Sequence, residues 1–266
     1  MSLNVQRSTV KINNNEMDYF TFGSGKIPFV MLPGLSVKSI LVSAEGVASA
    51  YRAFADDFTV YCFDRTKFLT KNYTIEMLSD DTAEAMRALG ITNACVFGAS
   101  MGGMMAQYIA IKHSELVGRL FLASTASRLN PLAQEVMGTW ISYAEAGDID
   151  SFCDYFIDVL YGRDFAAQFG EFIKLAHKDV TKEDFDRFVT LGTSCKSLNA
   201  YDRLDEIKCP TLVVGAENDR VLGAEASRET AEKLGCPIYM YGAEYGHCVF
   251  DEAPDYKDRI MNFFLK

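Results

Sequence analysis

The sequence has little of what marks membrane, secreted or nucleic-acid-binding proteins. No apolar run approaches the ~20 residues of a membrane span, and residues 1–16 are polar and lack the apolar core of a signal peptide. The 26 Lys and Arg residues are outnumbered by 36 Asp and Glu, so the net charge of −10 argues against a nucleic-acid partner. We expect a cytoplasmic monomer or homodimer whose partner is a small-molecule substrate, with no nucleic acid and no membrane.

Paired cysteine motifs are absent as well. The seven cysteines are odd in number and scattered, and no C-x-x-C occurs, which is typical of reduced thiols in a cytosolic protein. The sequence shows no internal repeat and no low-complexity tract. Its 266 residues, 49% of them hydrophobic, suffice for one well-packed domain that carries an inserted subdomain.

Apolar runs that suit buried strands alternate with helical segments. This alternation predicts an α/β fold, with a mostly parallel twisted sheet covered by helices on both faces and preceded by an antiparallel hairpin. A strand, a tight turn and a helix surround Ser100. The other expected strands lie at 10–12, 17–19, 27–32, 58–63, 116–123, 211–214 and 238–241, and the other helices at 44–55, 74–89, 224–234 and 253–265.

One segment breaks the alternation. From about Ala126 to Asn199 no strand pattern occurs, and apolar residues recur at helical spacing in four sets. The third of these sets is Phe165, Phe169, Phe172, Ile173 and Ala176. The pattern predicts a run of helices placed between two strands of the sheet.

We interpret this segment as a helical cap. Residues 126–200 should form the cap subdomain, and residues 1–125 and 201–266 the α/β core. Most aromatic side chains of the cap should pack in its own core, and a minority should roof an apolar pocket. The aromatic residues predicted to contact substrate there are Trp140, Tyr143 and Phe156.

A glycine-flanked serine carries the main chemical signal. Gly98-Ala99-Ser100-Met101-Gly102 follows a buried strand and opens a helix. Such a tight turn strains the backbone of its central residue, and glycines on both sides remove side chains that would collide. The turn exposes the Ser100 hydroxyl as a nucleophile. A Gly-rich turn into an ordinary helix would have the same spacing, so the motif needs partners elsewhere in the chain.

A serine nucleophile needs a base, and the chain has only three histidines. His113 is separated from Ser100 by about a dozen helical residues, roughly 18 Å at ~1.5 Å per residue, and is expected as a helix C-terminal residue. His177 falls within a helical segment and is expected on the surface. His247 follows the last predicted strand, at the sheet edge where a base belongs, and is the predicted base.

The acid that orients His247 should come from another loop at the same sheet edge. Asp219 is the predicted acid, and Glu217 is the alternative or a supporting group behind the triad. Asp251 could pair locally with His247, but it is expected near the N-terminus of the last helix. The order Ser100, Asp219, His247 is the one expected for such a triad on a parallel sheet.

Two backbone N–H groups are predicted to hold the oxyanion that forms when a carbonyl is attacked. One belongs to Met101. The other is assigned to Leu35 in Pro33-Gly34-Leu35-Ser36, the loop after the first buried parallel strand, where Gly34 allows close approach. An ordinary Pro-Gly turn is the alternative interpretation of this loop.

These motifs together resemble the α/β-hydrolase fold superfamily, over nearly the whole chain. The resemblance rests on residues 98–107, on 209–215 with Asp219, and on Gly246-His247. Within the superfamily the chain is similar to small esterases, enol-lactonases and methyl esterases with a helical cap. It departs from them where Pro33-Gly34 replaces the frequent His-Gly, and where no glycine follows Asp64-Arg65, so the loop at 64–69 should take its own course.

The resemblance and the residues imply a serine hydrolase that cleaves a small, apolar carboxylic ester, thioester or lactone through an acyl-enzyme at Ser100. No metal and no organic cofactor is expected. The same triad would also serve acyl transfer, C–C bond hydrolysis or cofactor-free perhydrolysis, and a non-catalytic ligand-binding protein is a further alternative. Dehalogenases and epoxide hydrolases of this fold use an aspartate nucleophile, which Ser100 argues against.

Overall fold

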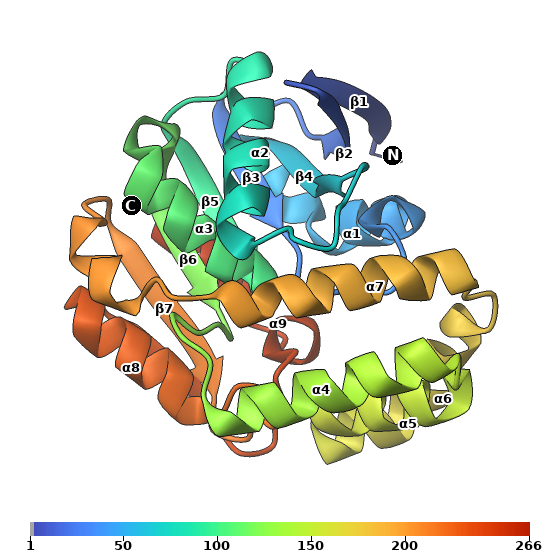
Figure 1. Cartoon of the computed structure of the whole chain (residues 1–266). Helices are drawn as coiled ribbons and strands as arrows, with labels where there is room; N and C mark the ends of the chain where they lie inside the picture. Colours follow the sequence, from blue (N-terminus) through green and yellow to red (C-terminus); the bar gives the residue numbers. More distant parts are fainter. Residues whose placement is uncertain (1–2) are drawn as a thin grey trace.

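The computed structural model describes residues 3–266, which build an eight-stranded sheet in the order β1-β2-β4-β3-β5-β6-β7-β8 (Figure 1). β1 pairs with β2 and β2 with β4 in antiparallel fashion, and all other neighbours are parallel. The predicted α/β class is therefore confirmed. The strands are β1 (Gln6–Ile12), β2 (Asn15–Phe22), β3 (Ile27–Leu32), β4 (Phe58–Thr66), β5 (Ala94–Ala99), β6 (Val117–Ala123), β7 (Thr211–Ala216) and β8 (Ile238–Tyr241).

Helices cover both faces of the sheet because its central strands are apolar on both sides. β5 is buried at every position, and two separate hydrophobic clusters lie on its opposite faces. One cluster includes side chains of α2 (Ile75–Ala88), α3 (Met101–Lys112) and α8 (Ala224–Leu234). The other includes side chains of α1 (Ala44–Ala50) and α10 (Tyr256–Phe264).

Two expected helices are shorter than predicted. The segment at 44–55 divides into α1 and a 3₁₀ turn at Arg52–Phe54. The last helix begins at Tyr256, after a separate short helix α9 (Val249–Glu252). Pro254 explains the second difference, because proline disfavours helical backbone in the residue before it, and Ala253 is extended. The helix at 224–234 and the strand at 238–241 agree with the prediction.

Four helices lie between β6 and β7, where the sequence predicts an insert (Figure 1). We refer to them as the helical insert: α4 (Pro131–Ala146), α5 (Ile149–Leu160), α6 (Arg163–His177) and α7 (Lys182–Ser194). A bridge between Arg128 and Asn199 joins the two ends of the segment. In Figure 1 the four helices lie together at the lower right of the molecule.

α6 does not bury the face that its spacing predicts. Gly170 is its one buried residue, and Phe172 and Leu175 are 71% and 59% exposed. Helical periodicity shows which side of a helix is apolar, but not whether another element covers that side. Phe172 is therefore an aromatic residue of the insert that does not pack in its core.

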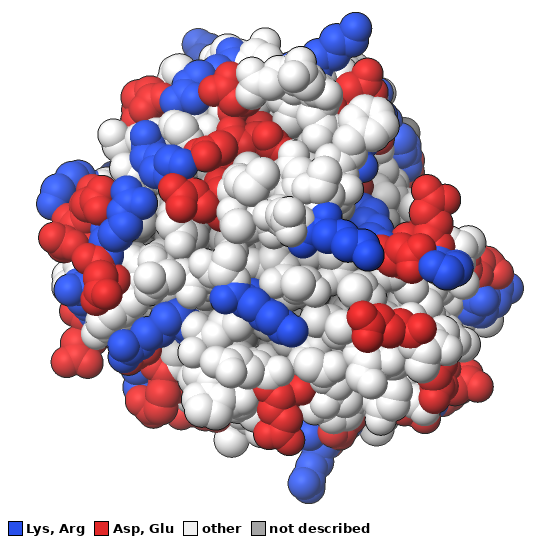
Figure 2. Space-filling view, in the orientation of Figure 1, with Lys and Arg blue, Asp and Glu red and all other residues white. Residues whose placement is uncertain are grey.

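Charged side chains of both signs are interspersed on the face seen in Figure 2. Elsewhere in the structure, too, exposed charges form ion pairs, as Arg228 does with Glu217 and Glu225. Exposed pairs of this kind contribute about 0–1 kcal/mol each, so they add solubility more than stability. Over residues 3–266, none of the helices has the length and apolarity that crossing a bilayer requires.

Candidate active site

Ser100 occupies the turn between β5 and α3. Its backbone has φ 50° and ψ −118°, a strained conformation for a residue with a side chain. The turn is held because Ser100 N donates to Ala123 O at 2.9 Å and Thr125 Oγ1 donates to Ser100 O at 2.7 Å. Contacts with β6 and the residues after it thus hold the strained backbone of Ser100, which keeps its hydroxyl at the sheet edge.

Glycines surround this turn because there is no room for larger residues. A Cβ on Gly98 would lie 2.6 Å from Gly102 O, and one on Gly102 would lie 1.9 Å from Leu32 O. A Cβ on Gly103 would meet the Thr125 side chain at 2.6 Å. The close approach of β3, β5 and α3 therefore requires the Gly-x-Ser-x-Gly-Gly sequence.

His247 and Asp219 form a buried pair beside Ser100. His247 Nδ1 lies 2.8 Å from Asp219 Oδ2, and the two residues are 1% and 5% exposed. Because an ionised carboxylate only accepts hydrogen bonds, Nδ1 carries the proton and Nε2 is left to accept one. This is the tautomer that a general base requires.

Asp219 is kept ionised by the groups around it. Its Oδ1 accepts hydrogen bonds from Val221 N and Leu222 N, both at 2.9 Å. Burial alone would raise the pKa of Asp219, but His247 and the two amides outweigh it, so the pKa lies below the usual value. The carboxylate can therefore orient the imidazole and stabilise its charged form.

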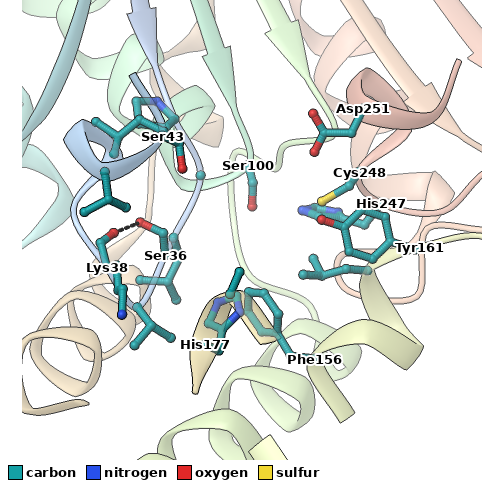
Figure 3. A pocket seen from close by; sticks show the side chains of 18 of the residues that line it. Ser36, Lys38, Ser43, Ser100, Phe156, Tyr161, His177, His247, Cys248 and Asp251 are labelled. Atoms are coloured by element: carbon teal, nitrogen blue, oxygen red, sulfur yellow. Dashed lines mark hydrogen bonds between the residues drawn. The ribbon is translucent and has the colours of Figure 1, made fainter. Parts of the chain in front are cut away.

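Ser100 and His247 line the same cavity, which has a volume of about 320 Å³ (Figure 3). Within residues 3–266 no hydrogen bond joins the Ser100 hydroxyl to His247. Catalytic hydrogen bonds are often long in the absence of substrate and shorten in the complex. The structure thus places Ser100 and His247 on one cavity, with Asp219 bonded to His247.

The predicted oxyanion groups are free to donate. Neither Leu35 N nor Met101 N has a hydrogen-bond acceptor among the described residues. The Leu35 loop is fixed from behind by Arg65, whose guanidinium donates to Pro33 O and Gly34 O. Burial lowers the pKa of Arg65 to about 10, so the side chain stays charged near neutral pH.

Arg65 is itself part of a connection to the insert. Its neighbour Asp64 accepts a hydrogen bond from Arg187 of α7 at 2.5 Å. The Asp64-Arg65 segment thus contacts both the insert and the Leu35 loop. This role fits the absence of the glycines that usually follow at this point of the sequence.

The insert provides the roof of the cavity through Trp140, Phe156, Leu160, Tyr161, Ala176 and His177. Trp140 and Phe156 were predicted here, and their rings pack together with centroids 5.1 Å apart. Tyr143 does not line the cavity and packs against Tyr155 instead. The expectation for Tyr143 is corrected, because its face of α4 is turned toward α5.

Sequence reasoning missed His177 as a cavity residue. His177 is not a surface histidine, since its ring lines the cavity and its Nδ1 lies 2.8 Å from Ile173 O (Figure 3). Its position at the end of α6, beside Ala176, places it there. Nothing in its sequence neighbourhood distinguishes it from an exposed histidine, so the insert's packing was needed to find it.

The other candidates lie elsewhere. His113 is the C-cap residue of α3, as predicted, and its Nε2 lies 2.9 Å from Asp80 Oδ1. Glu217 pairs with Arg228 on the surface and supports neither His247 nor Asp219. Asp251 lies in the first turn of α9, not of the last helix, and lines the cavity. Residues 3–266 contain no group of three or more His, Cys, Asp or Glu that could hold a metal ion.

The loop that carries His247 is fastened to the insert. Glu252 accepts hydrogen bonds from Gly246 N and Gly162 N, both at 2.9 Å, and Cys248 N donates to Leu160 O at 2.9 Å. A Cβ on Gly246 would lie 2.5 Å from the Tyr161 carbonyl carbon, so this contact is tight. We call Glu252 with Gly162 and Gly246 the Glu252 junction.

The chain resembles known proteins in sequence and in structure. A family model described as "Alpha/beta hydrolase family" matches residues 29–256. RutD from Rhizobium rhizogenes, which bears the name of a carbamate hydrolase, is 24% identical over 244 residues, covering 84% of this chain and 91% of that protein.

Two solved structures share the fold. MGS-M2, an alpha/beta hydrolase from a deep-sea metagenome library, has a TM-score of 0.87 at 19% identity, covering 97% of this chain and 98% of that one. The enol-lactonase from Burkholderia xenovorans has a TM-score of 0.82 at 20% identity, covering 97% of this chain and all (100%) of that one.

Proposed function

The chain belongs to the alpha/beta hydrolase family, and from this premise we propose that it is a serine hydrolase acting on a small, mostly apolar carboxylic ester, thioester or lactone. The observation that carries the proposal is the convergence on one cavity of Ser100 and His247, with Asp219 bonded behind the histidine. A nucleophile, a base and an orienting acid are what acyl-enzyme chemistry needs.

The proposed reaction has two halves. Ser100 Oγ attacks the carbonyl carbon while His247 Nε2 takes its proton, and the N–H groups of Leu35 and Met101 receive the oxyanion. The intermediate collapses, the bond to the leaving group breaks, and His247 protonates that group. Water then attacks the ester on Ser100 with His247 as base, which releases the acid and returns the proton to Ser100.

The cavity supports a small, mostly apolar substrate. Its volume of about 320 Å³ falls at the lower end of the ~300–1,000 Å³ typical of small-molecule sites. The roof includes Trp140, Phe156 and Leu160, which would pack on an apolar group. The names of two similar proteins, carbamate hydrolase and enol-lactonase, also refer to hydrolysis at an acyl carbon. The insert would act as a lid over this cavity.

The test is turnover of a p-nitrophenyl ester series from acetate to decanoate. We expect kcat/KM to peak at a short or medium chain, because the cavity volume limits the group that fits. Ser100→Ala should lose at least about 10³-fold in kcat, as expected for removal of a nucleophile. Ser8→Ala, on the exposed strand β1, is the matched control. Activity of Ser100→Ala within tenfold of the parent would refute the mechanism.

A different acceptor would point to the alternative reactions of the same site. Product analysis with added alcohol or hydrogen peroxide separates them, since an acyltransferase or perhydrolase would form the corresponding ester or peracid in preference to the free acid. If folded protein turns over no acyl substrate and binds small apolar molecules, it is a binding protein instead.

A further inference from the structure

A second cavity adjoins the one that holds Ser100. It has a volume of about 380 Å³ and lies between α1, α9 and the ends of β3 and β5. The two cavities share wall residues, namely Pro33, Gly34, Ile40, Ser43, Phe250 and Asp251. A molecule bound at Ser100 could therefore extend into the second cavity past Gly34, where a Cβ would lie 3.3 Å from Ser100 Cβ.

Asp251 stands at the junction of the two cavities without a partner. In the part of the chain that the structure describes, its carboxylate has no hydrogen bond and no ion pair. In Figure 3 the carboxylate points toward the side on which Ser100 and Ser43 lie. Asp251 is exposed to solvent, and the protein packed around it raises the pKa of its carboxyl group to about 6 through desolvation.

The nearest cation does not neutralise Asp251 directly. Lys257 lowers the pKa of Asp251 through space, while Glu252 raises it. The Lys257 ammonium donates to Phe250 O at 3.2 Å and lies 5.5 Å from the centre of the Tyr51 ring, so it is engaged elsewhere. The Asp251 carboxylate can thus accept a hydrogen bond from a ligand. The cavity wall contains one positive charge, on Lys257, and one negative charge, on Asp251.

The rest of the second cavity is mostly apolar. Its wall includes Met31, Val47, Ala50, Phe97 and Ala99. A ligand group that enters buries its hydrocarbon stem against these side chains. Where it covers the Asp251 carboxylate from water it should offer a donor, because an acceptor that loses its water without a new partner costs free energy. An anionic group would be repelled by Asp251, and a full cation would meet Lys257. A neutral O–H or N–H donor is compatible with both Asp251 and Lys257.

We propose that the second cavity is a substrate subsite in which Asp251 accepts a hydrogen bond from a neutral hydroxyl or amide N–H carried on a short apolar stem. This inference rests on the proposed function only in taking the ligand to be part of the substrate of Ser100. It narrows the substrate class to esters, thioesters or lactones that bear such a donor. Asp251 is then a specificity-determining residue and takes no part in the acyl transfer.

The test measures binding instead of turnover. Hexan-1-ol and its isomer methyl pentyl ether have the same atoms, but only the alcohol has a donor. Calorimetry with Ser100→Ala protein should show the alcohol bound about tenfold more tightly, the effect of one hydrogen bond to a charged acceptor. Hexanoate should bind at least tenfold more weakly than the alcohol, and hexylammonium should gain nothing over it.

Variants of Asp251 decide the outcome. In the Ser100→Ala background, Asp251→Leu should abolish the preference for the alcohol, and Asp251→Asn, which keeps a neutral acceptor, should retain part of it. Glu225→Gln removes one acid whose side chain is 84% exposed and should leave the preference unchanged. Equal binding of the two isomers, or a preference for the alcohol that survives Asp251→Leu, would overturn the proposal. If Asp251→Leu does not fold, an undiminished preference for the alcohol in Asp251→Asn would overturn it instead.

The two proposals fail separately. If the parent enzyme hydrolyses no ester but the isomers are still distinguished through Asp251, the subsite stands and the proposed function falls. If esters are hydrolysed and the isomers bind alike, the proposed function stands and the subsite falls.

Discussion

Replacing Glu252 should damage the enzyme without touching any reacting atom. Glu252 accepts one hydrogen bond from Gly246 N, next to His247, and one from Gly162 N, between α5 and α6, both at 2.9 Å. The Glu252 junction therefore fixes the histidine loop against the helical insert. Glu252→Ala would leave two partly buried N–H groups without their acceptor.

The magnitude follows from these two bonds. A hydrogen bond to a charged group contributes about 1.5–3 kcal/mol. Part of this is offset, because burial raises the pKa of Glu252 against the opposing effect of the two amides, and water can reach a half-buried site. We expect Glu252→Ala to lower the free energy of unfolding by about 2–4 kcal/mol and Glu252→Gln by about half as much, since an amide oxygen still accepts one bond.

Activity should fall because loss of the Glu252 junction would let His247 move out of position. A displacement of ~1 Å at a catalytic group can cost about 10²-fold, so kcat for p-nitrophenyl butyrate should drop by about 10- to 100-fold in Glu252→Ala. KM should change less, because the cavity walls remain. Urea unfolding and steady-state kinetics measure the two effects, with Glu225→Ala on the surface of α8 as the control.

Two outcomes would contradict this role of Glu252. If Glu252→Ala unfolds within about 0.5 kcal/mol of the parent and keeps kcat within twofold, the junction does not hold His247 in place. A loss of stability with unchanged kcat would show that the junction stabilises the fold and has no part in positioning the base.

The pH dependence of stability should have opposite signs for two acids. The folded-state pKa of Asp219 lies below the unfolded ~3.9, so its stabilisation is present above about pH 4 and is lost as the pH falls further; Asp219→Asn should therefore cost more at pH 7 than at pH 3. The folded-state pKa of Asp251 is about 6, so ionisation of this group lowers the stability of the fold as the pH rises from ~4 through 6. The stability of Asp251→Asn relative to the parent should therefore increase over that interval. Urea unfolding at several pH values checks both, and parallel profiles for parent and variants would contradict them. Gly102→Ala should yield no folded protein by circular dichroism, because its Cβ would lie 1.9 Å from Leu32 O, whereas Gly46→Ala, with nothing within 4 Å, should fold normally; a folded Gly102→Ala would show that the turn can relax.

The sequence predicted what depends on local pattern. The strand–turn–helix around Ser100 requires glycines at fixed spacing, and those are visible in the chain. His247 and Asp219 could be selected because few alternatives exist and parallel strands bring their C-terminal ends to one edge. The helical insert was predicted for the same reason, since periodicity persists over its four helices.

What the sequence could not predict depends on contacts between distant segments. Glu252 meets Gly162 across 90 positions, and Arg187 meets Asp64 across 123. His177 lines the cavity because α6 ends at the cavity wall. The apolar side of α6 that periodicity indicates is left exposed at Phe172. The unpaired state of Asp251 likewise depends on where Lys257 is held.

Whether Ser100 is an activated nucleophile is tested by covalent labelling of the parent protein with a fluorophosphonate, read by intact mass and peptide mapping. We expect a single adduct on Ser100, lost in Ser100→Ala and strongly slowed in Asp219→Asn, because only a serine activated by His247 reacts at a useful rate. No adduct on folded protein, or an adduct on another residue that persists in Ser100→Ala, would contradict the claim that Ser100 is the nucleophile.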